Sequence, residues 1–175
     1  KEDDSSVPQK DGDFIYWSKF DEGAQYRKHY RKPVKGGADQ LILDENKLAE
    51  GKDYFRLGAA EVSPDGKLLA YAYDDNGSER FDPHIRNLET GEKLPDIIPG
   101  MLSSIVWTKD SKGLVYGLAN ENWRTDNAYY HRLGDDRRRH ACGIRTATAE
   151  RGDRMRQMTG DSSSSGVPAY SPMRA

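Results

Sequence analysis

The feature that most constrains the fold is a turn followed by a strand, Val62–Tyr73. Ser63-Pro64-Asp65-Gly66 has the residues that a type I turn prefers, with Ser first, Pro second and Gly fourth. Lys67–Tyr73 then alternates as a β-strand does. Because both faces of this strand are apolar or aromatic, we expect an inner strand that is covered on both sides.

The same segment recurs 45 residues later, in Trp107–Tyr116. The matched pairs are Asp65 with Asp110, Lys67 with Lys112, Leu69 with Leu114 and Tyr71 with Tyr116. The offset continues without a gap to Leu133. Periods of roughly 40–50 residues that contain several short strands are typical of β-propeller blades. The sequence therefore predicts an all-β fold built from repeated antiparallel sheets.

Short runs with alternating polarity, bounded by turn residues, predict the other strands. We expect strands over Asp13–Phe20, Gln25–Arg31, Gln40–Leu43, Tyr54–Val62, Pro83–Leu88, Ser104–Trp107, Gly113–Leu118 and Ala128–Leu133. A helical turn is expected over Asp44–Gly51, with Asp44 as its N-cap. Residues 1–136 thus form a partial β-propeller domain of about two and a half to three blades, too few to close a ring.

Beyond residue 136 this pattern stops, and Gly134–Ala175 contains no Leu, Phe or Trp. We expect residues 137–175 to be an unstructured tail, because such a composition buries too little apolar area to offset the entropy of ordering. The alternative is a frame-shifted translation. Read two bases later, the codons of Gln157–Gly166 can encode Asp-Asp-Gly-Arg and then four apolar residues, where the next inner strand is due.

Composition and charge exclude several classes of protein. A net charge of −2 gives no electrostatic reason to expect nucleic acid as a partner. No apolar run approaches the ~20 residues that a membrane-spanning helix needs, so we expect no membrane segment. Cys142 is the only cysteine, which excludes an intramolecular disulfide and favours a reducing compartment.

Few residues suggest catalysis. A serine hydrolase of the α/β-hydrolase type needs a Gly-x-Ser-x-Gly elbow, which does not occur here, and Ser162–Gly166 lacks the first glycine and a preceding strand. His29, His84, His131 and His140 are general bases only on paper, since their places on strands or in the tail favour structural roles. His140 and Cys142 have no second pair at zinc spacing. We therefore predict no catalytic, cofactor-binding or metal-binding residues.

Other polar and aromatic residues are better explained by structure than by function. We expect the repeated Asp65 and Asp110 to accept backbone N–H groups at their turns rather than to form an acidic ligand site. Trp17, Trp107 and Trp123 are expected in blade packing rather than in a stacking platform for nucleic acid. Glu79 and Arg80 could pair between blades. Arg137–Arg139 is expected to be solvated or mistranslated rather than a phosphate site.

An ordered set of motifs resembles the propeller of oligopeptidase B, the bacterial and protozoan member of the prolyl oligopeptidase family. The resemblance covers residues 1 to about 136. Its motifs are Lys1–Pro8, Asp11-Gly12-Asp13, Asp53-Tyr54-Phe55, Glu61–Gly66, Gly77–Arg80, Arg86–Gly91, Pro99-Gly100, Val106-Trp107 and His131–Gly134.

This resemblance implies a cytoplasmic serine peptidase that cleaves short peptides after Lys or Arg. In that family a seven-bladed propeller caps an α/β-hydrolase domain and filters substrates by size. The present chain lacks the hydrolase domain, so we expect a fragment that is inactive alone. Its expected partners are short basic peptides, when it is joined to a catalytic domain, and other copies through open propeller edges. The alternative is a small self-associating propeller with a binding or scaffold role.

Overall fold

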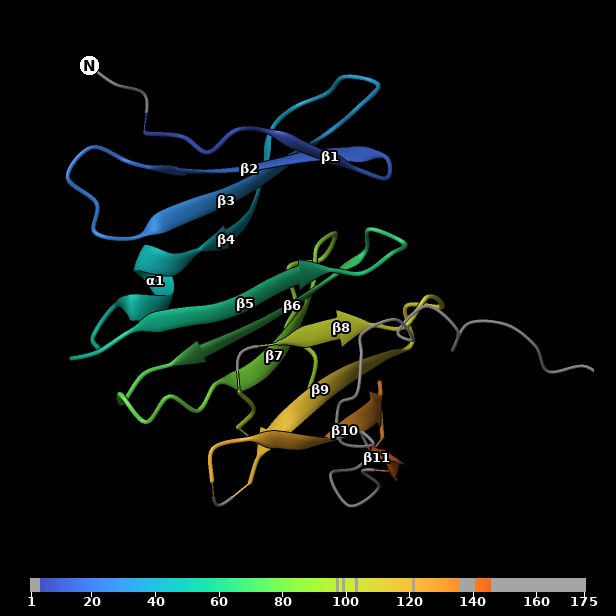
Figure 1. Cartoon of the computed structure of the whole chain (residues 1–175). Helices are drawn as coiled ribbons and strands as arrows, with labels where there is room; N and C mark the ends of the chain where they lie inside the picture. Colours follow the sequence, from blue (N-terminus) through green and yellow to red (C-terminus); the bar gives the residue numbers. More distant parts are fainter. Residues whose placement is uncertain are drawn as a thin grey trace, which may run out of the picture.

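The computed structural model describes residues 4–96, 98, 100–102, 104–120, 122–135 and 141–145. The chain folds into three antiparallel sheets that are stacked one above another (Figure 1). The first sheet has the order β1-β2-β3-β4, the second β5-β6-β7 and the third β11-β10-β9-β8. The elements are β1 (Gln9–Asp11), β2 (Phe14–Phe20), β3 (Arg27–Pro33), β4 (Gln40–Asp44), α1 (Glu45–Ala49), β5 (Arg56–Val62), β6 (Leu68–Asp74), β7 (Asp82–Asn87), β8 (Ile105–Trp107), β9 (Gly113–Ala119), β10 (Thr125–Arg132) and β11 (Ala141–Arg145).

Strand β6 is the centre of the stack, as its two apolar faces predict. Leu68, Ala70 and Ala72 face the third sheet, in a cluster that includes Ile105, Leu114 and Tyr116. Leu69, Tyr71 and Tyr73 face the first sheet, in a cluster with Tyr16, Ile42 and Leu43. The side chains of this one strand therefore belong to both hydrophobic clusters, which is why neither of its faces can be polar.

The period found in the sequence is also the period of the structure. Strand β9 begins and ends 45 residues after β6, and β8 ends 45 residues after β5. The turns that follow β5 and β8 lie at the same end of the molecule as the β1–β2 turn, on the right in Figure 1. The predicted all-β partial propeller of about three blades is confirmed.

The predicted helical turn is confirmed as α1. Asp44 precedes it with extended backbone (φ −117°, ψ 103°), and its carboxylate accepts the backbone N–H groups of Asn46 and Lys47. This is the hydrogen bonding expected of an N-cap. Within the described ranges, no helix has the length and hydropathy needed to cross a membrane.

Two strands were not predicted from the sequence. The first expected strand begins at Asp13, but Gln9–Asp11 already forms β1 and pairs with β2, so that Gly12 and Asp13 alone make the turn. Gly12 has a φ of 53°, a backbone conformation that glycine adopts at little cost. The second unpredicted strand is β11, which pairs with β10.

Strand β11 lies beyond residue 136, the predicted end of the propeller. Ile144 is the only large apolar residue in its sequence, but pairing to β10 depends on backbone hydrogen bonds that any residue except proline can make. Apart from this strand, the segment 137–175 lies outside the described residues. The unstructured tail and the frame-shifted reading of Gln157–Gly166 therefore stay predictions.

Candidate functional site

The repeated aspartates have the structural role expected of them. The Asp65 carboxylate accepts the backbone N–H of Lys67 at 3.1 Å and the hydroxyl of Ser63 at 2.6 Å. One period later, Asp110 accepts the N–H of Lys112 and the hydroxyl of Thr108 at the same distances. The hydrogen bond from Thr108 is the main cause that lowers the pKa of Asp110. Both carboxylates thus close their own turns.

The three described histidines lie on strands and have local partners. His29 lies 2.6 Å from Glu45 and His131 lies 2.7 Å from Asp96, each measured from Nε2 to a carboxylate oxygen. The His84 ring packs at a tilt against Tyr71 and Tyr73, and its partial burial lowers its pKa to about 4. His140 lies outside the described residues, as do Arg137–Arg139 and Ser162–Gly166.

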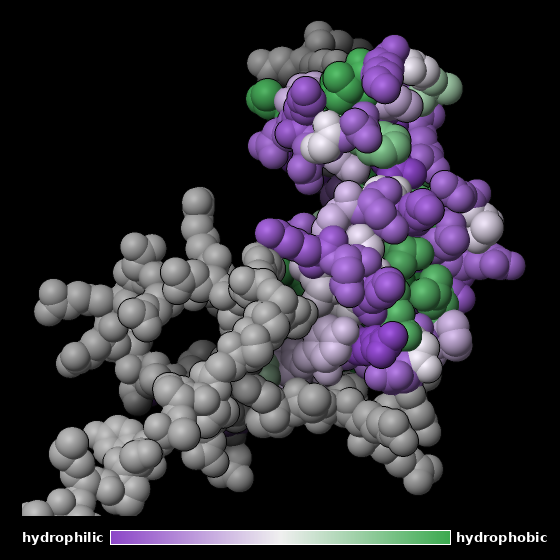
Figure 2. Space-filling view, turned by 90° about the vertical axis from the view of Figure 1, so that its right-hand side faces the viewer, coloured by the Kyte–Doolittle hydropathy of each residue, from purple (hydrophilic) through white to green (hydrophobic). Residues whose placement is uncertain are grey.

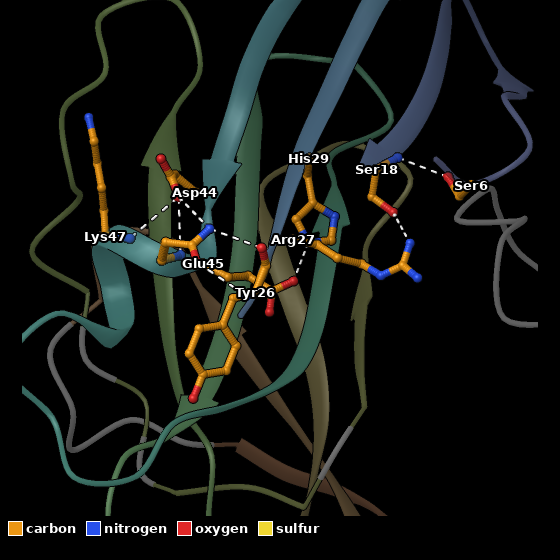
Figure 3. Close-up of polar contacts among 9 residues, drawn as sticks. Ser6, Ser18, Tyr26, Arg27, His29, Asp44, Glu45 and Lys47 are labelled. Atoms are coloured by element: carbon orange, nitrogen blue, oxygen red, sulfur yellow. Dashed lines mark hydrogen bonds and ion pairs between the residues drawn. The ribbon is translucent and has the colours of Figure 1, made fainter. Parts of the chain in front are cut away.

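One group of residues resembles a hydrolytic triad in composition but not in geometry (Figure 3). Ser18 and His29 are direct partners across β2 and β3, and His29 contacts Glu45. The Ser18 hydroxyl, however, accepts a hydrogen bond from Arg27 Nη1 at 3.1 Å rather than donating one to His29. Without a bond from serine to histidine the hydroxyl is not activated, so this array gives no nucleophile.

The tryptophans pack in different ways. Trp17 stacks on Tyr30 with ring centroids 5.7 Å apart, and Trp107 Nε1 donates to the backbone carbonyl of Glu61 at 2.9 Å, joining the third sheet to the second. Trp123 is different, because it is 52% exposed and contacts the guanidinium of Arg80, which lies 5.4 Å from its ring centroid. Among the described residues neither Glu79 nor Arg80 forms an ion pair, so the expected blade-to-blade pair is not found there.

A metal centre has no support in the part of the chain that the structure describes. No group of three or more His, Cys, Asp or Glu side chains in those residues is arranged to hold a metal ion. Cys142 lies in β11, and His140 lies outside the described residues.

Two adjoining cavities lie between the sheets at the end where the three turns gather. The larger, of about 660 Å³, lies between the first and second sheets and has an apolar wall that includes Ile42, Leu43 and Leu69. The smaller, of about 480 Å³, reaches the third sheet at Trp107. Both are lined by Asp11, Tyr16, Glu61 and Val62, and we call them together the turn-end groove.

Carboxylates are the main charged groups of the turn-end groove. They are Asp11 and Asp13 from the first sheet, Glu61 from β5, and Asp65. The opposing cation in the walls is Lys10. Figure 2 looks onto this end of the molecule and shows a largely hydrophilic surface. The groove is not predictable from the sequence, because the motif Asp-Gly-Asp gives no sign that it will face Glu61, about 50 residues away.

The turn-end groove raises the pKa of one of its acids. Desolvation of the Glu61 carboxyl is the main cause, and the negative charge of Asp11 adds to it. No described side chain forms a hydrogen bond or an ion pair with the carboxylates of Asp11, Asp13 or Glu61. All three of these residues are exposed, so their carboxylates are open to solvent.

Stacked antiparallel sheets that repeat every 45 residues define a β-propeller segment. The model of the family "Prolyl oligopeptidase, N-terminal beta-propeller domain" matches residues 1–152. The chain therefore belongs to the prolyl oligopeptidase family, as the sequence motifs indicated. The matched region extends past residue 136 and includes β11.

Curated relatives support the same family. The chain is 37% identical over 132 residues to a dipeptidyl aminopeptidase BI of Pseudoxanthomonas mexicana, covering 66% of this chain and 18% of the relative. It is 32% identical over 138 residues to Protease 2 of Moraxella lacunata, covering 74% of this chain and 20% of that protein. The chain thus spans about a fifth of the length of these relatives.

Solved structures resemble the chain over most of its length. Oligopeptidase B from Leishmania major superposes with a TM-score of 0.76 at 25% identity, covering 81% of this chain and 21% of that one. Oligopeptidase B from Trypanosoma brucei, with covalently bound antipain, gives a TM-score of 0.72 at 28% identity, covering 81% and 20%. The sheets described above are therefore arranged as in part of a peptidase propeller.

Proposed function

We propose that this chain contributes the substrate-filtering propeller of a serine oligopeptidase that cleaves short peptides after Lys or Arg. The observation that carries the proposal is the match of three stacked sheets to the propeller of oligopeptidase B. The chain supplies no catalytic residue in this proposal, because it has no Gly-x-Ser-x-Gly elbow and the Ser18–His29–Glu45 array in the described part lacks the serine-to-histidine bond. The single cysteine fits a reducing compartment, and we place the protein in the cytoplasm.

The first experiment tests whether the isolated chain has peptidase activity, using the purified chain and an Arg-Arg chromogenic peptide. We expect no hydrolysis that is sensitive to a serine-directed reagent. Turnover that the reagent does abolish would contradict the assignment of catalysis to a separate domain.

The filtering role is tested with a chimaera in which residues 1–135 replace the matching segment of an oligopeptidase B. We expect the chimaera to cleave short dibasic peptides and to leave folded proteins intact, because the blades restore the wall around the active site. A matched variant without this segment should lose stability or begin to degrade folded proteins. Loss of short-peptide cleavage in a folded chimaera would count against the proposal.

A second role, as a self-associating scaffold, is favoured by the unpaired edge strands. β1, β4, β5, β8 and β11 lie at the edges of their sheets, and an unpaired edge can pair with another chain. Size-exclusion chromatography separates the two roles. A discrete and cooperative oligomer supports the scaffold, whereas a monomer or non-specific aggregate supports the peptidase segment.

A further inference from the structure

We propose that copies of this chain stack head to tail, with the outer face of the first sheet of one copy packed on the outer face of the third sheet of the next. The outer face of each sheet is its side away from the second sheet. The inference rests on the second role proposed above, the self-associating scaffold. It goes beyond that role, because the contact joins the faces of sheets rather than their edges.

The outer face of the first sheet, at the top of Figure 1, is aromatic and open. Tyr16 belongs to the core cluster between the first and second sheets, so strand alternation places its neighbours Ile15 and Trp17 on the outer face. Trp17 pairs across the strands with Tyr30, which pairs in turn with Leu41. These four outer residues belong to neither hydrophobic cluster, and Leu41 is 41% exposed.

Trp17 holds the position at which the other sheets make their contacts. It is the middle residue of β2, as Tyr71 is of β6 and Tyr116 is of β9. Tyr71 packs against the first sheet at 5% exposure, and Tyr116 packs against the second sheet at 3% exposure. Trp17 is half-buried, in its stack with Tyr30. The outer face of the first sheet is thus equivalent to the faces by which the second and third sheets pack on their neighbours.

The outer face of the third sheet repeats the surface that receives such a face. Inside the stack, Ala70 and Ile85 pair across β6 and β7, and the third sheet buries both of them fully. One period later, Val115 and Tyr130 form the same cross-strand pair on β9 and β10, but they are half-buried. Val106 lies beside Val115 on β8 and is 59% exposed. The two ends of the stack are therefore the two halves of the contact that already occurs within it.

Charge favours a head-to-tail contact over a symmetric one. Lys19 and Lys32 lie over aromatic rings on the outer face of the first sheet, and neither forms an ion pair among the described residues. Two copies that met through their first sheets would bring these ammonium groups together, which is unfavourable. The middle of the third sheet's outer face, made of Val106, Val115 and Tyr130, carries no charge.

The stack itself shows the mode of contact. Its sheets are joined by the side chains of the two core clusters, and in the described part of the chain no strand of one sheet is paired with a strand of another. A head-to-tail contact between copies continues this packing. Because it joins two different surfaces, it gives closed rings or longer chains rather than a symmetric dimer.

Self-association is measured by size-exclusion chromatography with light scattering, over a wide range of concentrations of the purified chain. We expect oligomers whose mean mass rises with concentration. Trp17→Glu, or the milder Leu41→Lys, blocks the first sheet's face, and Val106→Lys blocks the third sheet's face; each of these variants should be a monomer. Tyr54→Glu is the matched control and should associate as the unmodified chain does, because Tyr54 is 39% exposed and lies outside both faces.

A mixture of two blocked variants is the sharpest test. Trp17→Glu keeps the third sheet's face and Val106→Lys keeps the first sheet's face, so an equimolar mixture should form a heterodimer that grows no further. Formation of this heterodimer also shows that both variants are folded. Undiminished association of the blocked variants, or a mixture that stays monomeric, would overturn the inference.

These results separate the contact from the roles proposed for the chain. A discrete oligomer that the blocked variants leave intact rejects the faces but keeps the scaffold, with edge pairing as its mechanism. An unmodified chain that is monomeric at every concentration rejects the faces and the scaffold together. The peptidase-segment proposal is independent of both results, because the chimaera tests it.

Discussion

Ser111 accepts a hydrogen bond from the backbone N–H of Asp65, with 3.1 Å between the nitrogen and the hydroxyl oxygen. This bond joins the second and third sheets at their equivalent turns, because Ser111 stands one period after Gly66. Ser111 has a φ of 57° and Gly66 a φ of 72°. A serine therefore occupies the left-handed position that the other turn gives to glycine, and it makes an inter-sheet contact that glycine cannot make.

The first prediction separates the effect of the Ser111 hydrogen bond from the effect of its left-handed backbone. Ser111→Ala removes the hydrogen bond and keeps the strained backbone, so we expect a loss of about 1–2 kcal/mol in the free energy of unfolding. Ser111→Gly removes the same bond but relieves the strain, so it should cost less. Urea unfolding of the three proteins measures the difference. A larger loss in the glycine variant would show that backbone strain is unimportant at this turn.

The second prediction concerns Arg31, which is buried at 4% exposure and ties the first sheet to the second. Its Nε donates to the side chain of Gln40 at 2.7 Å, while Nη1 donates to the carbonyl of Gly66. Arg31→Ala leaves both acceptors without this donor and should destabilise the chain by about 3 kcal/mol or more.

Arg31→Lys tests whether the two-donor geometry of the guanidinium matters in addition to its charge. Lysine has one nitrogen and cannot reach both acceptors in the planar arrangement of the guanidinium, so we expect only partial recovery. Full recovery of the urea midpoint in the lysine variant would show that charge, not geometry, is what the site requires.

Much of the fold could be predicted because the sequence repeats. The places of Asp65 and Asp110 in two copies of one motif predict that both are turn residues, and both close their turns as expected. Burial of both faces of β6 is predictable in the same way, since each alternate set of apolar side chains needs its own covering layer. Repetition and alternation are local patterns, and local patterns can be read from sequence.

The turn-end groove could not be predicted in the same way. Asp11 and Glu61 meet only because two sheets stack, and no local pattern records that approach. The edge strands β1 and β11 could not be predicted from the sequence for a related reason. Their pairing depends on backbone groups of β2 and β10, while their own side chains carry little apolar periodicity.

The third prediction tests a close approach within the second sheet. A Cβ at Gly58 would lie 2.3 Å from Cδ1 of Phe81, which is 4% exposed and part of the core. Gly58→Ala should therefore destabilise the chain by about 1–3 kcal/mol through overpacking. Phe81→Leu alone should also cost stability, because it opens a cavity.

The double variant Gly58→Ala with Phe81→Leu distinguishes this clash from a general intolerance at Gly58. We expect its loss to be smaller than the sum of the two single losses, because the smaller leucine leaves room for the added methyl. Strict additivity in chemical denaturation would show that the methyl and the ring do not interact.

The last prediction follows from His84, whose pKa is lowered from 6.5 to about 4, mainly by burial. In the unfolded chain His84 takes up a proton near pH 6.5, whereas in the folded chain it stays neutral to about pH 4. Between these values the unfolded state binds more protons, so the free energy of unfolding should fall as the pH falls. Above pH 6.5 both states are neutral at this residue and its contribution is constant.

Urea unfolding at several pH values between 4 and 7 checks this, with His84→Gln as the comparison. The glutamine variant should be less stable at pH 7, because it loses the ring contacts with Tyr71 and Tyr73, yet its stability should depend less on pH. Acids such as Asp110, whose pKa is lowered from 3.8, lose their contribution below this window and are unchanged in the variant. Glu61 acts in the opposite direction, since its raised pKa makes the folded state bind more protons, but it too is common to both proteins. Parallel pH profiles for the two proteins would mean that His84 is protonated in the folded chain as readily as in the unfolded one.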